Sequence, residues 1–569
     1  MTGQISRHRD IDALKVAAQW PDADRATVVN LAARLAAVGA DADGYRFFAE
    51  QADVHPGEPL WLSLAGFFQA RTGSDVDAAI AKLDWAADRD LGLPQYFRGQ
   101  ALAALPPDPQ RAERAVADLT FVLAVRDQFP VALIRAAHHG LARAYAMLGK
   151  DDLAAAAVSD SGLAGLPEDS GLQFGGYWAT ARDGFRFTSP GVYQPEPAAR
   201  VLQGHDFADF ALISTGAGIV AIDAGSTAPR VRTALAGLGL ADDQQVTHLI
   251  LTHAHFDHVG GIDALRGPGT QVITHARFPE ELRRQRGSTL PFGWFLGEGG
   301  SLDHHITPDR LVSEPEVISA AGLELALYPT PGGETSDALM IYLPSSGLLF
   351  TGDVMMPYLG APFFAEGSPD GLLETLTFIR QLRPRLLIQG HTPLTELFTI
   401  ETIPGLEAAL TELHGQVIAD LRGGRTLAQI LHQNKLPETL RDHPKAVLPY
   451  LVMRDNFTAR LYHQRTGYWQ PDGTGMEPLL AGERAAALDL LGGGREDSFV
   501  AAATTLAGQG DHALALEIIS PGLLRYPASA ALQDLRRRVL RRLLAQHQQD
   551  PFRFLIYAEL AGVETGPTR

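Results

Sequence analysis

The first part of the chain carries apolar residues at steps of three and four, which is the spacing of amphipathic α-helices. Short breaks rich in Gly, Pro and Asp separate the periodic stretches, as expected between consecutive helices. The periodic stretches are residues 25–38, 59–70, 76–89, 94–104, 109–126 and 131–148. We therefore predict that residues 1–180 form a helical domain.

Two of these stretches resemble each other. RGQALAAL, which starts at Arg98, and HGLARAYAML, which starts at His139, share a Gly-x-Ala/Leu-Ala pattern. Repeated helix pairs of this kind are typical of tetratricopeptide-like arrays. Because Ala-rich hairpins also repeat by chance, the pattern favours a structural scaffold over a peptide-binding groove.

After residue 180 the pattern changes. From about residue 200 to residue 392, short β-type runs alternate with helical ones, which predicts an α/β layered domain over residues 181–400. The β-type runs are DFALISTGAGIVAIDAG, VTHLIL, QVITHARF, LELALYPTP, DALMIYLP, GLLFTGDVM and RLLIQGHTP. Residues 401–569 return to helical spacing, and we predict a second helical domain there.

The run VTHLIL ends at a group of side chains that can bind metals. His253, His255, Asp257 and His258 follow it within six positions. In an extended segment residues two apart share a face, so we expect His253, His255 and Asp257 to project into one cavity and His258 to turn the other way. Such a group at the end of a strand indicates a metal centre.

Three further acids or imidazoles each follow a β-type run and a glycine. They are Glu334 in YPTPGGETSD, Asp353 in LLFTGDV and His391 in LLIQGHT. Together with the first group they can bind two metals. The predicted ligands are His253, His255 and Glu334 for one ion, and Asp257, His258 and His391 for the other, with Asp353 between them.

The composition limits the metal and the partners. The chain has no cysteine, so the ligands are nitrogen and oxygen atoms; they suit two Zn²⁺ ions best, with Fe or Mn as alternatives. The formal net charge of -18 disfavours a nucleic-acid partner. Since the sequence shows neither a long apolar run nor an apolar signal core at its start, we expect a cytoplasmic protein without a membrane span.

The string T-H-x-H-x-D-H-x-G-G, the later Gly-Asp and the final Gly-His together resemble the metallo-β-lactamase superfamily. The resemblance implies an αββα sandwich with two metals in a cleft at the sheet edges. It also implies a hydrolase in which a metal-bridging hydroxide, oriented by Asp257 and Asp353, attacks an ester of a small molecule. Bound divalent metals lower the pKa of water to ~7, which agrees with this chemistry.

One position narrows the resemblance. The commonest pattern of the superfamily is Pro-Gly-His-Thr, whereas this chain has Pro331-Gly332-Gly333-Glu334-Thr335. Alkylsulfatases similarly place Glu after Pro-Gly-x. Blocks such as TLAQILHQNKLPETL and PYLVMRDNFTARLYHQRTGYWQPDG also resemble the alkylsulfatase dimerisation domain. The resemblance therefore implies an alkyl or aryl sulfate ester as substrate and a homodimer formed through residues 401–569.

The chain departs from the alkylsulfatase pattern in one respect that concerns the substrate. Family members commonly carry an Arg shortly after the bridging acid, yet PYLGAPFFAEGS contains no Lys or Arg. Arg277, or Arg283 and Arg284, could supply the cation that holds the sulfate. They could equally be surface residues of a helix.

Other functions stay open. A phosphodiester or phosphotriester hydrolase, or a lactonase, is the enzymatic alternative, because the same hydroxide can attack phosphorus or a carbonyl carbon. Glyoxalase-type thioesterases usually carry the histidine that Glu334 replaces. A helical-repeat scaffold with a relict metal site is the non-enzymatic alternative, which the seven intact candidate ligands disfavour.

Overall fold

The computed structural model describes residues 9–161, 177–238, 245–290, 292–360, 364, 366–467, 476–548 and 550–565, apart from the side chains of residues 127 and 131. The chain forms two compact units, each built from two separate segments. One unit combines Met1–Val28 with Ala181–Met476, and the other combines Val29–Thr180 with Glu477–Arg569.

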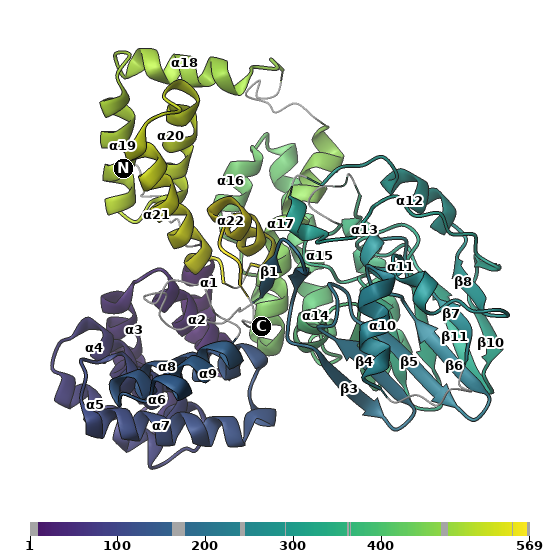
Figure 1. Ribbon diagram of the computed structural model, residues 1–569, viewed down its shortest axis with the longest axis horizontal. Helices are drawn as coiled ribbons and strands as arrows, with labels where there is room; N and C mark the ends of the chain where they lie inside the picture. The colour runs from purple at the N-terminus through teal and green to yellow at the C-terminus, as the bar shows by residue number, and fades with distance from the viewer. Residues whose placement is uncertain are drawn as a thin grey trace. The chain divides into compact units, whose positions relative to one another are not determined.

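Two β-sheets form the centre of the first unit (Figure 1). The seven-stranded sheet has its strands in chain order: β3 (Gly191–Glu196), β4 (Ala199–Gln203), β5 (Phe210–Thr215), β6 (Gly218–Ile222), β7 (Val246–Ile250), β8 (Gln271–His275) and β9 (Arg310–Val312). The five-stranded sheet is likewise ordered: β10 (Glu316–Ala320), β11 (Leu323–Pro329), β12 (Leu339–Leu343), β13 (Leu348–Gly352) and β14 (Leu386–Gln389).

Apolar side chains from both sheets form one shared core. Ile222 and Ile250 of the first sheet belong to the same buried cluster as Leu327, Phe350 and Ile388 of the second. Burial of an aliphatic or aromatic side chain of this size contributes about 1.5–3 kcal/mol to folding, so this layer is a main source of stability for the sandwich.

Helices accompany both sheets. Val231 of α10 and Leu282 of α12 belong to a second buried cluster with Leu249 of β7. On the five-stranded sheet, Phe378 of α13 packs on Tyr328 of β11, with ring centroids 4.9 Å apart. The helices of this unit are α1 (Arg9–Ala18), α10 (Ala228–Ala236), α11 (Phe256–Val259), α12 (Phe278–Gln285), α13 (Pro369–Leu382), α14 (Thr392–Leu397), α15 (Ile403–Arg422), α16 (Leu427–His432) and α17 (Val447–Thr466).

Short elements complete this unit: strand β2 (Gly184–Arg186) and the 3₁₀ turns η3 (Ile262–Ala264), η4 (Gly293–Phe295), η5 (Glu438–Arg441) and η6 (Pro444–Ala446). The architecture is therefore the predicted αββα sandwich with helical segments before and after it in the sequence, and the predicted fold class is confirmed.

The second unit is almost entirely helical. Its elements are α2 (Arg25–Ala37), which begins before the unit boundary, α3 (Asp41–Val54), α4 (Pro59–Thr72), α5 (Val76–Ala87), α6 (Leu93–Ala104), α7 (Pro109–Ala124), η1 (Arg126–Gln128), α8 (Val131–Met147), α9 (Asp151–Ser161), β1 (Trp178–Thr180), α18 (Ala481–Leu491), α19 (Glu496–Gly508), α20 (His512–Arg525), α21 (Ala530–Gln546) and α22 (Pro551–Ala561). Asp75 and Asp108 cap α5 and α7 with their carboxylates, which satisfies backbone N–H groups that a helix start leaves open.

The sequence pattern locates the regular elements better than the irregular ones. The pattern over residues 59–70 corresponds to α4, whereas no strand was predicted at β3. Strand β3 is an exposed edge strand that contains Pro195, and such strands lack the apolar alternation that prediction depends on. The residues from 162 to 176, where the first predicted domain approaches its boundary, lie outside the described part of the chain. The division at residues 180 and 400 stays a prediction.

None of the described helices combines the length and apolar character that crossing a bilayer requires.

Candidate metal centre

The sheet topology explains why the candidate ligands meet. Strands β6, β7 and β8 pair in parallel, as do β13 and β14. The carboxyl ends of the parallel strands of each sheet therefore lie at the same edge of that sheet. Strand β7 is followed by the histidine string, β13 by Asp353 and β14 by His391. Ligand sites in α/β sheets form where such carboxyl ends meet.

The loop after β7 differs from the expected extended segment. His255 is extended and is the N-cap of the short helix α11, which contains Asp257 and His258. The prediction that His258 turns away from the site was therefore wrong. Once the chain enters a helical turn, the two-residue alternation of a strand no longer applies. His258 Nε2 lies 3.6 Å from Asp257 Oδ2, so both side chains face the same centre.

His253, His255 and Glu334 form the first group. Glu334 Oε2 lies 3.3 Å from His253 Nε2 and 3.5 Å from His255 Nδ1. All three residues are buried, and one ligand atom from each lies within 4.8 Å of the others. The loop that carries Glu334 comes after β11, which runs in the same direction as β13 and therefore delivers it to the same edge.

Asp257, His258 and His391 form the second group, again with ligand atoms within 4.8 Å of one another. His391 Nε2 lies 3.5 Å from Asp257 Oδ2. Asp353 Oδ2 lies 3.4 Å from His258 Nε2 and 2.9 Å from His391 Nε2. Asp353 also groups with His253 and His258, so its carboxylate lies between the two sets.

The donor atoms of this cluster fit divalent cations. Buried polar atoms normally have hydrogen-bond partners, because leaving them unpaired costs free energy. Among the described residues, five buried atoms of the cluster make no hydrogen bond of acceptable geometry: His253 Nε2, His258 Nε2, His391 Nε2, Glu334 Oε2 and Asp353 Oδ1. Divalent cations bound in the two ligand groups would satisfy these atoms, and imidazole with carboxylate is a donor set that Zn²⁺ accepts.

Each imidazole is held in the orientation that such a site needs. A metal-binding histidine usually donates its second N–H to a neighbouring oxygen, which leaves the other nitrogen bare. His258 Nδ1 donates to Asp223 Oδ2 at 2.8 Å, and His391 Nδ1 donates to the Phe207 carbonyl at 3.0 Å. His255 Nε2 donates to Glu366 Oε1 at 2.8 Å.

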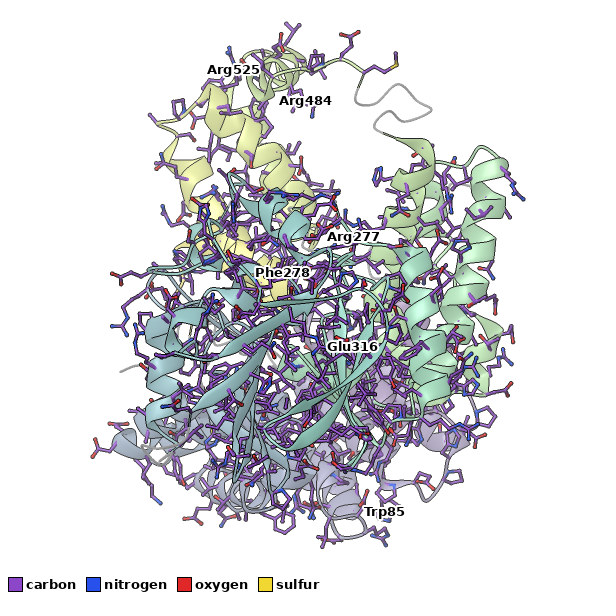
Figure 2. All side chains as sticks on the ribbon, turned by 90° about the vertical axis from the view of Figure 1, so that its right-hand side faces the viewer. Trp85, Arg277, Phe278, Glu316, Arg484 and Arg525 are labelled. Carbon is purple, nitrogen blue, oxygen red and sulfur yellow. The ribbon has the colours of Figure 1, made fainter. Side chains whose placement is uncertain are left out.

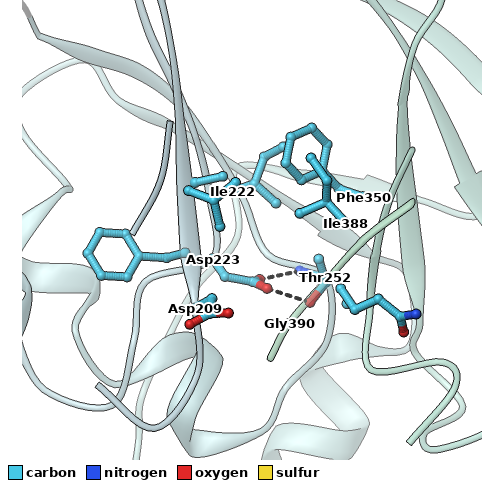
Figure 3. Close-up of a pocket in the computed structure, with 12 residues that line it drawn as sticks. Asp209, Ile222, Asp223, Thr252, Phe350, Ile388 and Gly390 are labelled. Atoms are coloured by element: carbon cyan, nitrogen blue, oxygen red, sulfur yellow. Dashed lines mark hydrogen bonds between the residues drawn. The ribbon is translucent and has the colours of Figure 1, made fainter. Parts of the chain in front are cut away.

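His253, the fourth histidine, is also oriented by a hydrogen bond from its second nitrogen, in this case to Thr252. The Thr252 hydroxyl and backbone N–H both donate to the carboxylate of Asp223, each at 2.8 Å (Figure 3). The hydroxyl can then accept from His253 Nδ1, 3.0 Å away. Asp223 thus fixes two imidazoles, directly and through Thr252, next to a small cavity that it lines between the sheets.

Without a cation, opposing charges in this cluster shift the protonation equilibria strongly. Burial lowers the pKa of His255, but the carboxylates of Glu366 and Glu334 outweigh it and raise that pKa to about 10. Burial raises the pKa of Glu334 well above its ordinary value. Burial also acts to raise the pKa of Asp353, yet the imidazoles of His391 and His258 hold it well below its usual range. Protons therefore balance the charge that metals would otherwise balance, and metal binding should release them.

A neighbouring carboxylate supports the His391 segment. Asp209 is buried, and its Oδ2 accepts a hydrogen bond from the Thr392 hydroxyl at 2.7 Å. Its backbone N–H donates to the Gly390 carbonyl at 2.7 Å. Burial raises the pKa of Asp209 to about 7. These contacts fix the residues on both sides of His391.

Sequence reasoning missed Asp223, Asp209 and Glu366. Asp223 had a signal, because it directly follows a β-type run, as Asp353 also does. It has a positive φ of 61°, which is uncommon for a residue other than glycine. Glu366 had no local signal, since it lies in a loop whose position only the folded chain determines.

Arg277 lies at the start of α12, next to Phe278 (Figure 2). Its side chain is 50% exposed, and its Nε lies 3.9 Å from Glu280 Oε2. Arg284 pairs with Glu280 and Glu281. A role for Arg277 in holding a sulfate stays a prediction.

Known proteins resemble this chain in fold and in sequence. The family model of the metallo-β-lactamase superfamily matches residues 205–391. A hydroxyacylglutathione hydrolase of Fuscovulum blasticum is 30% identical over 223 residues, which cover 37% of this chain and 75% of that protein. The chain belongs to the metallo-β-lactamase superfamily and is a metal-dependent hydrolase.

Two further similarities are to alkylsulfatases of the same superfamily. The linear primary-alkylsulfatase of Pseudomonas sp. (strain ATCC 19151) is 22% identical, over 58% of this chain and 69% of that protein. The structure of a stereoselective inverting sec-alkylsulfatase from Pseudomonas sp. shares the fold, with a TM-score of 0.54, 18% identity and coverage of 65% of this chain and 66% of that one. The chain thus spans about two thirds of these relatives and resembles the alkylsulfatases of the superfamily in sequence and in fold.

Proposed function

We propose that the protein hydrolyses sulfate esters of alkyl or aryl alcohols at a centre that binds two divalent cations, with Zn²⁺ as the first choice. The observation that carries the proposal is the pair of buried ligand groups with Asp353 between them. The similarity to alkylsulfatases supports the substrate class. Glu334 in place of a histidine agrees with it.

Two divalent cations bound there would lower the pKa of a bound water to ~7 and polarise the ester oxygen. The chain supplies orientation. Asp257 and Asp353 would orient the attacking water by accepting its hydrogen bonds. Asp223 and the Phe207 carbonyl hold His258 and His391 so that their Nε2 atoms stay directed at the centre.

The organic part of the substrate needs an apolar surface near this centre. The Phe364 ring lies 6.0 Å from the ring of His255 and is half-buried, so it can contact an alkyl or aryl group. Met355 and Met356, which precede Phe364 in the segment after β13, are buried and pack in the protein interior instead.

A panel of alkyl sulfates, aryl sulfates, phosphodiesters, lactones and a hydroxyacyl thioester, run on zinc-loaded protein, tests the proposal. We expect turnover of at least one sulfate class, two metal ions per chain by elemental analysis, and loss of activity after chelation. In ¹⁸O water, label in the alcohol reports C–O cleavage and label in the sulfate reports S–O cleavage.

Several results of this panel would contradict the proposal. Turnover of phosphodiesters or lactones without any sulfate would favour the alternative hydrolases. Turnover of the thioester alone would favour the activity named for the Fuscovulum blasticum relative. Fewer than one ion per chain and no turnover would favour a helical scaffold with a relict site.

We also propose a homodimer that forms through the C-terminal helices. Leu480 at the start of α18 and Leu490 and Leu491 at its end are 70%, 81% and 85% exposed, and large exposed apolar side chains can contribute to an interface. Light scattering should then give about twice the chain mass of 61.2 kDa. The double substitution Leu490→Glu and Leu491→Glu should yield monomers, whereas the control Leu153→Glu on α9 should not. A monomeric unsubstituted protein would refute the proposal.

A further inference from the structure

Residues 364 and 366–368, between β13 and α13, contact both the candidate metal centre and helix α17. They are called the loop below. Glu366 lies in this loop, and its Oε1 accepts the 2.8 Å hydrogen bond from His255 Nε2. The side chains of Glu366 and His255 are 14% and 6% exposed, so this contact is largely shielded from water. A shielded carboxylate that holds a ligand imidazole fixes its ring orientation and raises its basicity.

Helix α17 holds the loop on both sides of Glu366. Arg460 Nη2 donates to the Phe364 carbonyl at 3.2 Å, and Gln464 Nε2 donates to the Gly367 carbonyl at 2.9 Å. The two donors are four positions apart, which places them on the same face of the helix. One face of α17 therefore fixes the backbone before and after the carboxylate.

Close packing at the base of the loop adds a second constraint. A Cβ on Gly367 would lie 1.8 Å from the Leu359 carbonyl oxygen, and a Cβ on Gly360 would lie 2.6 Å from Glu366 Cγ. The backbone N–H of Ser368 donates to the Gly333 carbonyl at 2.8 Å, beside the ligand Glu334. The backbone from Glu366 to Ser368 thus has little freedom to move away from His255.

We propose that α17 is a positioning element of the metal centre: Arg460 and Gln464 hold the loop so that Glu366 orients His255. This inference rests on the metal site of the proposed function. The effect should be confined to the group of His253, His255 and Glu334, because the imidazoles of the other group depend on Asp223 and the Phe207 carbonyl. The helix would then control the affinity of one ion and not of the other.

Zinc titrations against a chromophoric chelator test the inference without reference to activity. Glu366→Ala should weaken one zinc ion by about 10–100-fold and leave the other unchanged, and Glu366→Gln should have a smaller effect because an amide oxygen still accepts the hydrogen bond. Gln464→Ala should weaken the same ion by about fivefold, the loss expected from one neutral hydrogen bond.

A double-mutant cycle shows whether Gln464 acts through Glu366. In the Glu366→Ala background, Gln464→Ala should cause no further loss of zinc affinity. The control is Arg465→Gln on the same helix, whose guanidinium lies 3.2 Å from Asp370 rather than on the loop. Since Gln464 and Arg465 are exposed, their substitution should leave the melting temperature of the metal-free protein unchanged.

The outcomes separate this inference from the proposed function. The inference would be overturned if Glu366→Ala and Gln464→Ala left the zinc affinity of both ions as it is in the unsubstituted protein. Additive losses of affinity in the double-mutant cycle would also overturn it. Failure of the unsubstituted protein to bind zinc would instead refute the metal site itself. Absorption spectra of the Co²⁺-loaded proteins give an independent readout, since Glu366→Ala should alter the spectrum of one site only.

Discussion

Asp257→Asn is expected to lower kcat/KM by ~10³-fold or more while the chain stays folded. Asp257 lies in the second ligand group, and its Oδ2 is 3.5 Å from His391 Nε2. Asparagine keeps the shape of the side chain but removes its negative charge. That charge attracts a cation and strengthens the hydrogen bond that the carboxylate accepts from water. Loss of several kcal/mol of metal-assisted stabilisation corresponds to about three factors of ten in rate.

Stability should respond in the opposite direction in the metal-free protein. Burial raises the pKa of Asp257, so a charge there without a cation costs folding free energy, and the neutral amide removes that cost. Metal-free Asp257→Asn should therefore melt no lower than the unsubstituted protein, yet gain less stability from zinc. Asp263→Asn, an exposed acid six positions further on, is the control and should change neither quantity. Full activity in Asp257→Asn would refute its place in the centre.

Gly390→Ala is expected to lower both metal content and turnover, the latter by on the order of 100-fold. A Cβ at this position would lie 2.2 Å from Asp353 Oδ1 and 2.5 Å from His258 Cε1. His258 belongs to the second ligand group and Asp353 lies between the two groups, so at least one of these two side chains must shift. Displacement of a positioned group by ~1 Å can reduce a rate about 10²-fold.

The backbone offers no way to relieve this clash. The N–H of Gly390 donates to the Gly352 carbonyl at 3.0 Å, and its carbonyl accepts from Asp209 N at 2.7 Å. Gly415→Ala on α15 is the matched control, because nothing lies within 4 Å of its Cβ position. That substitution should keep full activity and raise stability by about 0.5–1 kcal/mol. Normal zinc content and turnover in Gly390→Ala would contradict the tight packing.

The sequence pattern anticipated an α/β layered domain because strand signals are local, whereas the αββα arrangement was implied only by the resemblance to the metallo-β-lactamase superfamily. The run of β13 is largely apolar and is buried along its whole length, since both faces of this strand are covered. Edge and short strands were missed for the converse reason: β9 has three residues, and β3 is largely exposed. Their pairing depends on neighbouring strands, which no local pattern encodes.

The sequence by itself determined which donor types this protein places at the ends of its strands, and the absence of cysteine restricted them to nitrogen and oxygen. Only the tertiary structure decided how His258 faces and which groups hold the imidazoles. Asp223 and His258 are 35 positions apart, and His255 and Glu366 are 111 apart. Contacts over such separations form only when whole sheets and helices pack, because the chain between them has no local preference for either partner.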